Sequence, residues 1–182
     1  MTTAHDVSDP ADAAGRRTLP PARGTTYAVG FVCLGNICRS PMADVVLSRL
    51  VREAGLGDRV MVSSCGTGPW HVGEPIDPRA GATLTAAGYD ASAHRGRQLD
   101  RDWLELDLLL AMDDDNLAGV RGLGADPERA RLFRSFDPLV PEDEPVPDVP
   151  DPYFGGEEGF TEVLAMVERT CARLLDELRT AA

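Results

Sequence analysis

The 182-residue sequence contains no lysine, and all 18 of its basic residues are arginine. This absence excludes a Schiff-base lysine and the lysine of a Walker-type phosphate loop. Any phosphate site in this chain must therefore be built from backbone N–H groups and arginine side chains.

Long apolar runs are also missing, since none approaches the roughly 18 residues that a membrane-spanning helix needs. Residues 1–17 have no apolar segment of the kind found in secretory signals. We therefore expect a cytoplasmic protein whose 4 cysteines are reduced thiols rather than a disulfide framework. A net charge of −12 argues against nucleic acid or an anionic membrane as a partner.

The length and the order of patterns predict one α/β domain. Residues 1–25 are rich in Ala, Asp, Pro and Thr without periodicity, so we expect a disordered extension before a domain spanning residues 26–182. Buried strands and amphipathic helices alternate along that domain. This alternation predicts a doubly wound, four-stranded parallel sheet with helices on both faces. The strands are expected at 26–33, 59–67, 106–112 and 130–133, and the later helices at 77–87, from about 114, and at 157–179.

Residues 137–152 differ from the rest of the chain because six are proline and six are acidic. Proline removes backbone donors, so this segment cannot be a helix or an interior strand. We expect a long loop that ends in "DPYFGG", and loops of this length in compact domains are either mobile or functional.

The turn "CLGNICRS", residues 33–40, carries the chemistry. It lies between a strand and a helix, for which we read Ser40 as the N-cap and Pro41 as the first helical residue. Successive N–H groups and a helix N-terminus can cradle a phosphate there, with Gly35 and Asn36 allowing the backbone to curl. The same positive field favours the thiolate of Cys33, and Arg39 can present a planar fork to phosphate oxygens.

Four segments together resemble the low-molecular-weight protein-tyrosine phosphatases, over about residues 27–179. "VCLGNICRSP" is similar to that family's first signature, and "DPYFGG" (151–156) to its second. "WHVGEPIDPR" (70–79) resembles its substrate wall, and "HRGRQL" (94–99) its histidine-containing stretch. The resemblance implies a phosphate-monoester hydrolase that acts through a cysteinyl-phosphate and needs no cofactor or metal.

The resemblance also implies a role for each matching residue. It makes Cys33 the nucleophile, Arg39 the phosphate clamp, and Asp151 the general acid and later the base. A hydrogen-bond network that shapes the loop is expected from Asn36, Ser40, Ser64 and His94. The residues expected to bind phosphate are Leu34, Gly35, Asn36, Ile37, Cys38, Arg39 and Ser40, and the substrate cleft is expected to include Leu34, Ile37, Trp70, His71 and Tyr153. A deep pocket with aromatic walls suits phosphotyrosine, because a phosphoserine would leave Cys33 out of reach.

Cys38 has two interpretations. A thiol beside a reactive thiolate can trap its sulfenic acid as a reversible disulfide, which would make Cys38 a redox partner of Cys33. Alternatively, Cys38 is only small and apolar enough to fit the turn. Cys65 and Cys171 lie in a strand and on an apolar helical stripe, and we expect both to be inert core thiols.

The sequence leaves two rival functions open. One is an arsenate reductase of the same fold, which needs a relay of thiols near the loop and no aspartate acid. The other is an inactive phosphopeptide-binding module, which has no reason to retain both a nucleophile and an acid. The chain also departs from the family in its N-terminal extension, in Phe154 where a second tyrosine is frequent, and in Cys65. As partners we expect phosphotyrosine-containing proteins or peptides, with the chain a monomer or weak dimer.

Overall fold

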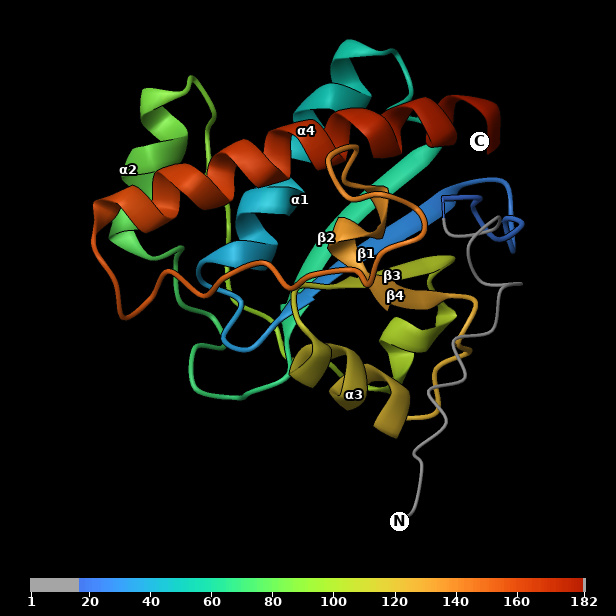
Figure 1. Cartoon of the computed structure of the whole chain (residues 1–182), viewed down its shortest axis with the longest axis horizontal. Coiled ribbons are helices and arrows are strands. Elements are labelled where there is room, and N and C mark those ends of the chain that lie inside the picture. Colours follow the sequence, from blue (N-terminus) through green and yellow to red (C-terminus); the bar gives the residue numbers. More distant parts are fainter. Residues whose placement is uncertain (1–16, 182) are drawn as a thin grey trace.

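The computed structural model describes residues 17–181. Its centre is a four-stranded, fully parallel sheet in the order β2-β1-β3-β4 (Figure 1). The strands are β1 (Tyr27–Cys33), β2 (Val60–Gly66), β3 (Leu108–Ala111) and β4 (Ala130–Leu132). The predicted fold class is therefore confirmed.

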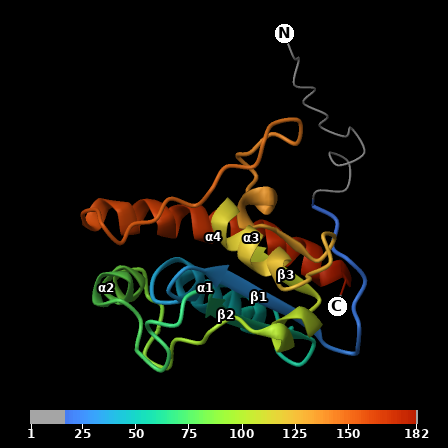
Figure 2. The same cartoon turned by 90° about the horizontal axis from the view of Figure 1, so that it is seen from below.

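The helices cover both faces of the sheet. The helices α1 (Arg39–Glu53), α2 (Pro78–Ala86) and α4 (Glu157–Ala181) lie on one side, as Figures 1 and 2 show. The helix α3 (Asp114–Gly122) lies on the other side, where the short 3-10 helix η2 (Arg101–Glu105) also packs. A second 3-10 helix, η3 (Phe133–Phe136), follows β4 and packs with α4.

Two separate apolar clusters hold these layers together. Alternate strand residues face opposite sides, so Phe31 and Leu110 join the cluster beneath α1 and α4. Val32 and Leu109 join the smaller cluster beneath α3. Because strands buried on both faces read as continuous apolar runs, "LDLLLAM" was recognisable as an interior strand.

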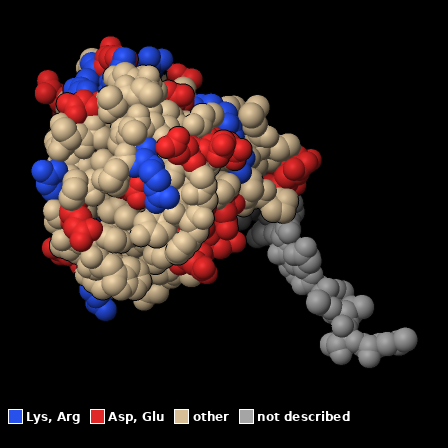
Figure 3. Space-filling model, turned by 90° about the vertical axis from the view of Figure 1, so that its left-hand side faces the viewer, with Lys and Arg blue, Asp and Glu red and all other residues tan. Residues whose placement is uncertain are grey.

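The strands β1 and β2 end side by side, with Cys33 paired to Gly66 at the carboxyl-terminal end of the sheet. A Cβ on Gly66 would lie 2.7 Å from the carbonyl oxygen of Leu34, so only glycine lets the turn after β1 lie against β2. Parallel sheets bind ligands at this end. Figure 3 looks onto this end of the molecule, where most of the surface is uncharged and acidic and basic side chains are scattered across it.

The prediction for the start of α1 was wrong by two residues. The helix begins at Arg39 with Cys38 as N-cap, and no side chain caps it. The hydroxyl of Ser40 points to Cys33 and to the carbonyl of Cys65 instead. A serine committed to these partners cannot also cap the helix, which is why the local pattern was misleading.

The expected disordered extension, residues 1–25, lies mostly outside the described residues, but 17–25 are described and differ from that expectation. The Arg17 guanidinium donates to the carbonyls of Asp137 and Val140, at 3.2 and 2.8 Å. The Tyr27 hydroxyl donates to the carbonyl of Pro20 at 3.0 Å. Arginine reaches distant carbonyls, so a segment without periodicity of its own is held by the folded domain.

No helix among residues 17–181 is both long enough and apolar enough to cross a membrane.

Candidate active site

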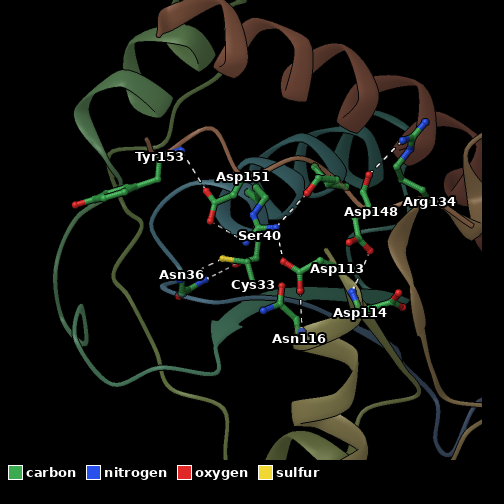
Figure 4. A network of polar contacts seen from close by, with 12 residues as sticks. Cys33, Asn36, Ser40, Asp113, Asp114, Asn116, Arg134, Asp148, Asp151 and Tyr153 are labelled. Atoms are coloured by element: carbon green, nitrogen blue, oxygen red, sulfur yellow. Dashed lines mark hydrogen bonds and ion pairs between the residues drawn. The ribbon is translucent and has the colours of Figure 1, made fainter. Parts of the chain in front are cut away.

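The turn from Cys33 to Ser40, here called the phosphate loop, closes around the sulfur of Cys33. The Asn36 N–H donates to this sulfur at 3.2 Å, and the Ser40 hydroxyl donates at 2.9 Å (Figure 4). Asn36 has a φ of 54°, the left-handed conformation expected for it. Two donors from the turn itself therefore point at this one sulfur.

Asn36 is the centre of a support that lies behind the loop. Its side-chain NH2 donates to Ser40 at 2.9 Å, and its side-chain oxygen accepts from the Arg97 N–H at 2.9 Å. His94 Nε2 lies 2.7 Å from the Asn36 carbonyl oxygen, so this nitrogen must carry the proton. Burial lowers the pKa of His94, which keeps the ring neutral near pH 7.

Arg39 is buried and ordered by groups from three parts of the chain. Its guanidinium contacts Asp113 at 2.6 Å, Asp151 at 3.2 Å and the carbonyl of Val149 at 3.1 Å. Burial opposes its charge, but the Cys33 sulfur and the carboxylates of Asp113 and Asp151 raise the pKa of Arg39 above its ordinary value. A permanent positive charge therefore lies beside the Cys33 sulfur.

Asp151 approaches the phosphate loop from the far end of the chain. One carboxylate oxygen contacts Arg39, and the other accepts the Tyr153 N–H at 3.1 Å. Figure 4 shows Asp151 above Cys33, with Tyr153 pointing outward beside it. The side chain of Asp151 is 40% exposed, so it reaches both the cavity and solvent.

These groups meet in a cavity of about 160 Å³. The lining residues are Cys33, Leu34, Gly35, Ile37, Cys38, Arg39, Trp70, His71, Asp151, Tyr153 and Phe154. A Cβ on Gly35 would lie 3.2 Å from the His71 ring, so glycine keeps the wall of the cavity close to the loop. The base of the cavity is polar and its outer walls are aromatic.

Four expected site residues do not line the cavity. Asn36, Ser40 and His94 support the loop through the bonds described above. The Ser64 hydroxyl donates to Asp44 on α1 at 2.9 Å, not to the loop itself. Its contribution to the loop is therefore indirect.

Cys38 lies on the cavity wall at the N-cap of α1, with only 5% of its surface exposed. Burial raises the pKa of the Cys38 thiol, and the negative charges of Asp77 and Cys33 raise it further. Cys38 is thus a protonated thiol near pH 7. Within the described residues all four cysteines are free, and Cys65 and Cys171 are buried.

Sequence reasoning missed three contributors to the site. Asp113 caps α3 by accepting the Asn116 N–H at 2.7 Å, and its second oxygen also holds Arg39. The carbonyl of Val149 and the exposed ring of Phe154 were likewise missed. The sequence did hold one sign of this role for Asp113, which follows closely on the interior strand β3. Ligands of parallel sheets bind beyond the carboxyl ends of the strands, so an acidic residue there was a candidate for the site.

The segment 137–152, here called the acidic loop, is held from its two ends. Asp137 is fully buried and bonds Arg134 at 3.0 Å and both donors of Arg169 at 2.8 Å. Near the other end, Asp148 accepts the Asp114 N–H at 3.0 Å, and its carbonyl accepts from Arg134 at 3.2 Å (Figure 4). Between these anchors the loop projects from the domain (Figure 2).

Among residues 17–181, no three histidine, cysteine, aspartate or glutamate side chains lie close enough together to hold a metal ion. The donors around the cavity are instead suited to a phosphate-sized anion, because Arg39 and the loop surround it with positive charge.

Comparisons with known proteins agree with this geometry. The family model "Low molecular weight phosphotyrosine protein phosphatase" matches residues 28–182. The chain is 48% identical to a low molecular weight protein-tyrosine-phosphatase of Streptomyces coelicolor over 85% of this chain and 94% of that one. It is 45% identical to low molecular weight protein-tyrosine phosphatase A of Mycobacterium tuberculosis, over 81% and 89% of the two chains.

A solved structure shows the same architecture. The crystal structure of YfkJ from Bacillus subtilis superposes with a TM-score of 0.78 and 31% identity, covering 87% of this chain and 98% of that one. The family model covers nearly the whole described domain, and the curated relatives share close to half of their residues with it. The chain belongs to the low molecular weight phosphotyrosine protein phosphatase family.

Proposed function

We propose that this protein hydrolyses phosphotyrosine in proteins or peptides through a cysteinyl-phosphate on Cys33. One observation carries the proposal: the Cys33 sulfur accepts two hydrogen bonds at the base of a cavity whose walls also contain Arg39 and Asp151. Nucleophile, anion clamp and proton donor are then within reach of one phosphate.

In the first step the Cys33 thiolate attacks phosphorus. The S–P bond forms as the P–O bond to the tyrosine ring breaks, and Asp151 gives its proton to the leaving phenolic oxygen. Arg39 binds the equatorial oxygens, on which negative charge is spread in the transition state. Asp113 and the carbonyl of Val149 hold the guanidinium in place for this task.

In the second step water attacks the phosphorus of the cysteinyl-phosphate. Asp151, now a carboxylate, takes a proton from this water, and the S–P bond breaks to release phosphate and the Cys33 thiolate. The Ser40 hydroxyl, 2.9 Å from the sulfur, stabilises the leaving thiolate. The proton that Asp151 gives to the leaving oxygen in the first step is replaced in the second step by a proton from water.

The shape of the cavity supports an aryl substrate. Trp70, Tyr153 and Phe154 supply apolar walls around an opening to the buried sulfur, which is only 3% exposed as part of Cys33. A phosphorylated tyrosine spans the distance from these walls to the sulfur, whereas phosphoserine is shorter by the whole ring. We further propose that the protein works in the cytoplasm, in keeping with its reduced cysteines.

The test is acid-quenched trapping of the intermediate with a 32P-labelled phosphotyrosine peptide. The wild type should form acid-stable protein-bound phosphate at Cys33, and Cys33→Ser should form none while still binding inorganic phosphate. Cys65→Ser, a buried thiol away from the cavity, is the matched control and should label normally. Substantial turnover by Cys33→Ser, or faster reaction with arsenate or a phosphoserine peptide, would overturn the proposal.

A further inference from the structure

The molecule has a second and larger hollow, of about 740 Å³, on the outer side of α1 next to the edge strand β2. One wall is the face of α1 that carries Asp44, Arg49 and Arg52, and the other is the segment from 88 to 97. Its volume lies in the range of about 300–1,000 Å³ that is usual for ligand sites. The cavity at Cys33 is smaller, at about 160 Å³.

The side chains that line this hollow include more positive than negative charges, whereas the whole chain is strongly negative. The protein carries a net charge of −12, yet the lining contains four arginines and three carboxylates. The arginines are Arg49, Arg52, Arg95 and Arg97, and the carboxylates are Asp44, Glu53 and Asp90.

Within the described residues, two of the four arginines make ion pairs and two do not. Arg49 pairs with Glu53 at 2.7 Å, and Arg97 lies 3.9 Å from Asp44. Among residues 17–181, the Arg95 side chain donates to backbone carbonyls of its own turn and makes no ion pair. Within the described residues Arg52 has no ion-pair partner, although its field lowers the pKa of Asp90 after the bonds from Ser92.

The same wall touches the phosphate loop from behind. Asn36 is held by His94 at 2.7 Å and by the Arg97 N–H at 2.9 Å, and both residues line the hollow. A ligand that draws the Arg95 and Arg97 side chains together therefore acts on the segment that fixes the left-handed Asn36. Within residues 17–181 the two cavities have no lining residue in common, and Asn36 connects them because it belongs to the phosphate loop and bonds two residues that line the hollow.

We propose that the hollow between α1 and residues 88–97 binds a compact oligophosphate anion, and that binding is coupled to the phosphate loop through Asn36. Guanidinium groups match phosphate oxygens in planar pairs, and several of them favour an anion with several phosphate groups. The effect on turnover rests on the proposed phosphatase activity, but the binding itself does not.

The test is a calorimetric titration with inorganic tripolyphosphate, with saturating phenylphosphonate present to fill the cavity at Cys33. The wild type should bind one tripolyphosphate. Arg52→Gln/Arg95→Gln should bind it at least about tenfold more weakly, since two charge-assisted contacts are lost. The matched control is Arg59→Gln/Arg121→Gln, which removes the same charge outside the hollow. Arg121 lies in the last turn of a helix, as Arg52 does, and Arg59 lies in a loop, as Arg95 does. This control should keep the wild-type affinity within about twofold.

Each contrary result has a definite meaning. No binding by the wild type, or equal weakening in both double variants, would overturn the site. Equal affinity for a hexaglutamate peptide would overturn the assignment to phosphate. The coupling is read from the amide 15N resonances of Asn36 and Arg97, which should shift with tripolyphosphate in the wild type and not in Arg52→Gln/Arg95→Gln. Because neither readout needs turnover, failure of the phosphatase proposal would leave this result interpretable.

Discussion

The phosphate loop and the acidic loop both reach the cavity, but they are held in opposite ways. The phosphate loop is closed by local bonds, since Asn36 and Ser40 bond the Cys33 sulfur within seven residues of chain, and His94 and Arg97 add support from outside. The acidic loop is tied to distant parts, because Asp137 bonds Arg169 across 32 residues and Asp151 bonds Arg39 across 112. The shape of the phosphate loop therefore depends largely on residues close together in the sequence. The position of the acidic loop depends on contacts with residues far away in the sequence.

This difference matches what each loop is proposed to do. Attack on phosphorus needs a nucleophile and an anion cradle of fixed geometry, and a short turn before a helix supplies both. Proton transfer to the leaving oxygen needs one carboxylate delivered from the other side of the substrate. A long loop held by distant parts of the chain can deliver Asp151 to that side.

The strongest test of the role proposed for the acidic loop is Asp151→Asn, which removes only the proposed acid. We expect phosphoryl transfer from phosphotyrosine to slow by about 10² to 10⁴, because a phenolic oxygen of pKa about 10 needs the proton. An activated nitrophenyl phosphate needs it much less and should slow far less. Pre-steady-state burst rates measure this step alone.

Asp148→Asn is the matched control for that experiment, since Asp148 is a carboxylate of the same loop that contacts Asp114 and does not line the cavity. Its burst rates should stay near those of the wild type. Equal slowing of both substrates by Asp151→Asn would mean that Asp151 is not the acid.

Asp137→Asn tests whether the acidic loop is held by its buried anchor. The substitution leaves Arg134 and Arg169 without their shared carboxylate, and we expect the free energy of unfolding to fall by about 2–3 kcal/mol. Burial alone would raise the pKa of Asp137, but the bonds from Arg169, the Leu139 N–H and Arg134 lower it below its usual value. The wild type should therefore keep this stability above about pH 4 and lose it at lower pH, and Asp137→Asn should lose less.

Urea unfolding at pH 7 and at pH 3.5 measures both effects. The control is Asp143→Asn, which removes the same charge at an exposed position of the same loop. If the two variants are equally stable, Asp137 does not anchor the loop.

Cys38→Ser tests whether the phosphate loop also protects its own nucleophile. Peroxide converts Cys33 to a sulfenic acid, and a Cys38 thiolate can then form the disulfide with loss of hydroxide. We expect dithiothreitol to restore activity in the wild type but not in Cys38→Ser, with the Cys33–Cys38 disulfide seen by mass spectrometry. Burial raises the pKa of Cys38, so disulfide formation should become faster as the pH rises. Cys65→Ser should recover like the wild type, and equal recovery of Cys38→Ser would make Cys38 a packing residue.

His94→Gln is expected to have the smallest effect and asks how far the phosphate loop depends on outside support. Glutamine can still donate to the Asn36 carbonyl, so stability at pH 7 should change by about 1 kcal/mol or less. Burial lowers the pKa of His94, which means that the folded protein resists protonation. Wild-type stability should thus decline as the pH falls from about 6.5 toward 5, and His94→Gln should lack this part of the decline.

Urea unfolding across this pH range measures the contribution of His94, with His71→Gln as the histidine control. His71 bonds Glu74 at the cavity wall, and among the described residues no hydrogen bond joins its side chain to Asn36. If the free energy of unfolding of His94→Gln falls with pH as steeply as that of the wild type, His94 does not cause the decline.

The elements that could be predicted from the sequence are those with a strong local signal. The strand at Tyr27–Cys33, the left-handed Asn36 and the stripe of α4 follow from period, turn chemistry and apolar spacing over a few residues. The start of α1 could not be read in this way. Ser40 has the right chemistry for a cap, and only its distance to the Cys33 sulfur shows where its hydroxyl is used.

By itself, the sequence determined the α/β class, the phosphate loop and the identity of Cys33, Arg39 and Asp151 as candidates. These depend on residues close together in the chain, or on two motifs each of which is local. Tertiary structure alone decided that Asp113 holds Arg39, that Arg17 joins the acidic loop, and that an arginine-lined hollow lies behind Asn36. The physical reason is that a salt bridge or hydrogen bond between residues far apart in sequence has no local pattern, because it exists only once packing has brought the two side chains together.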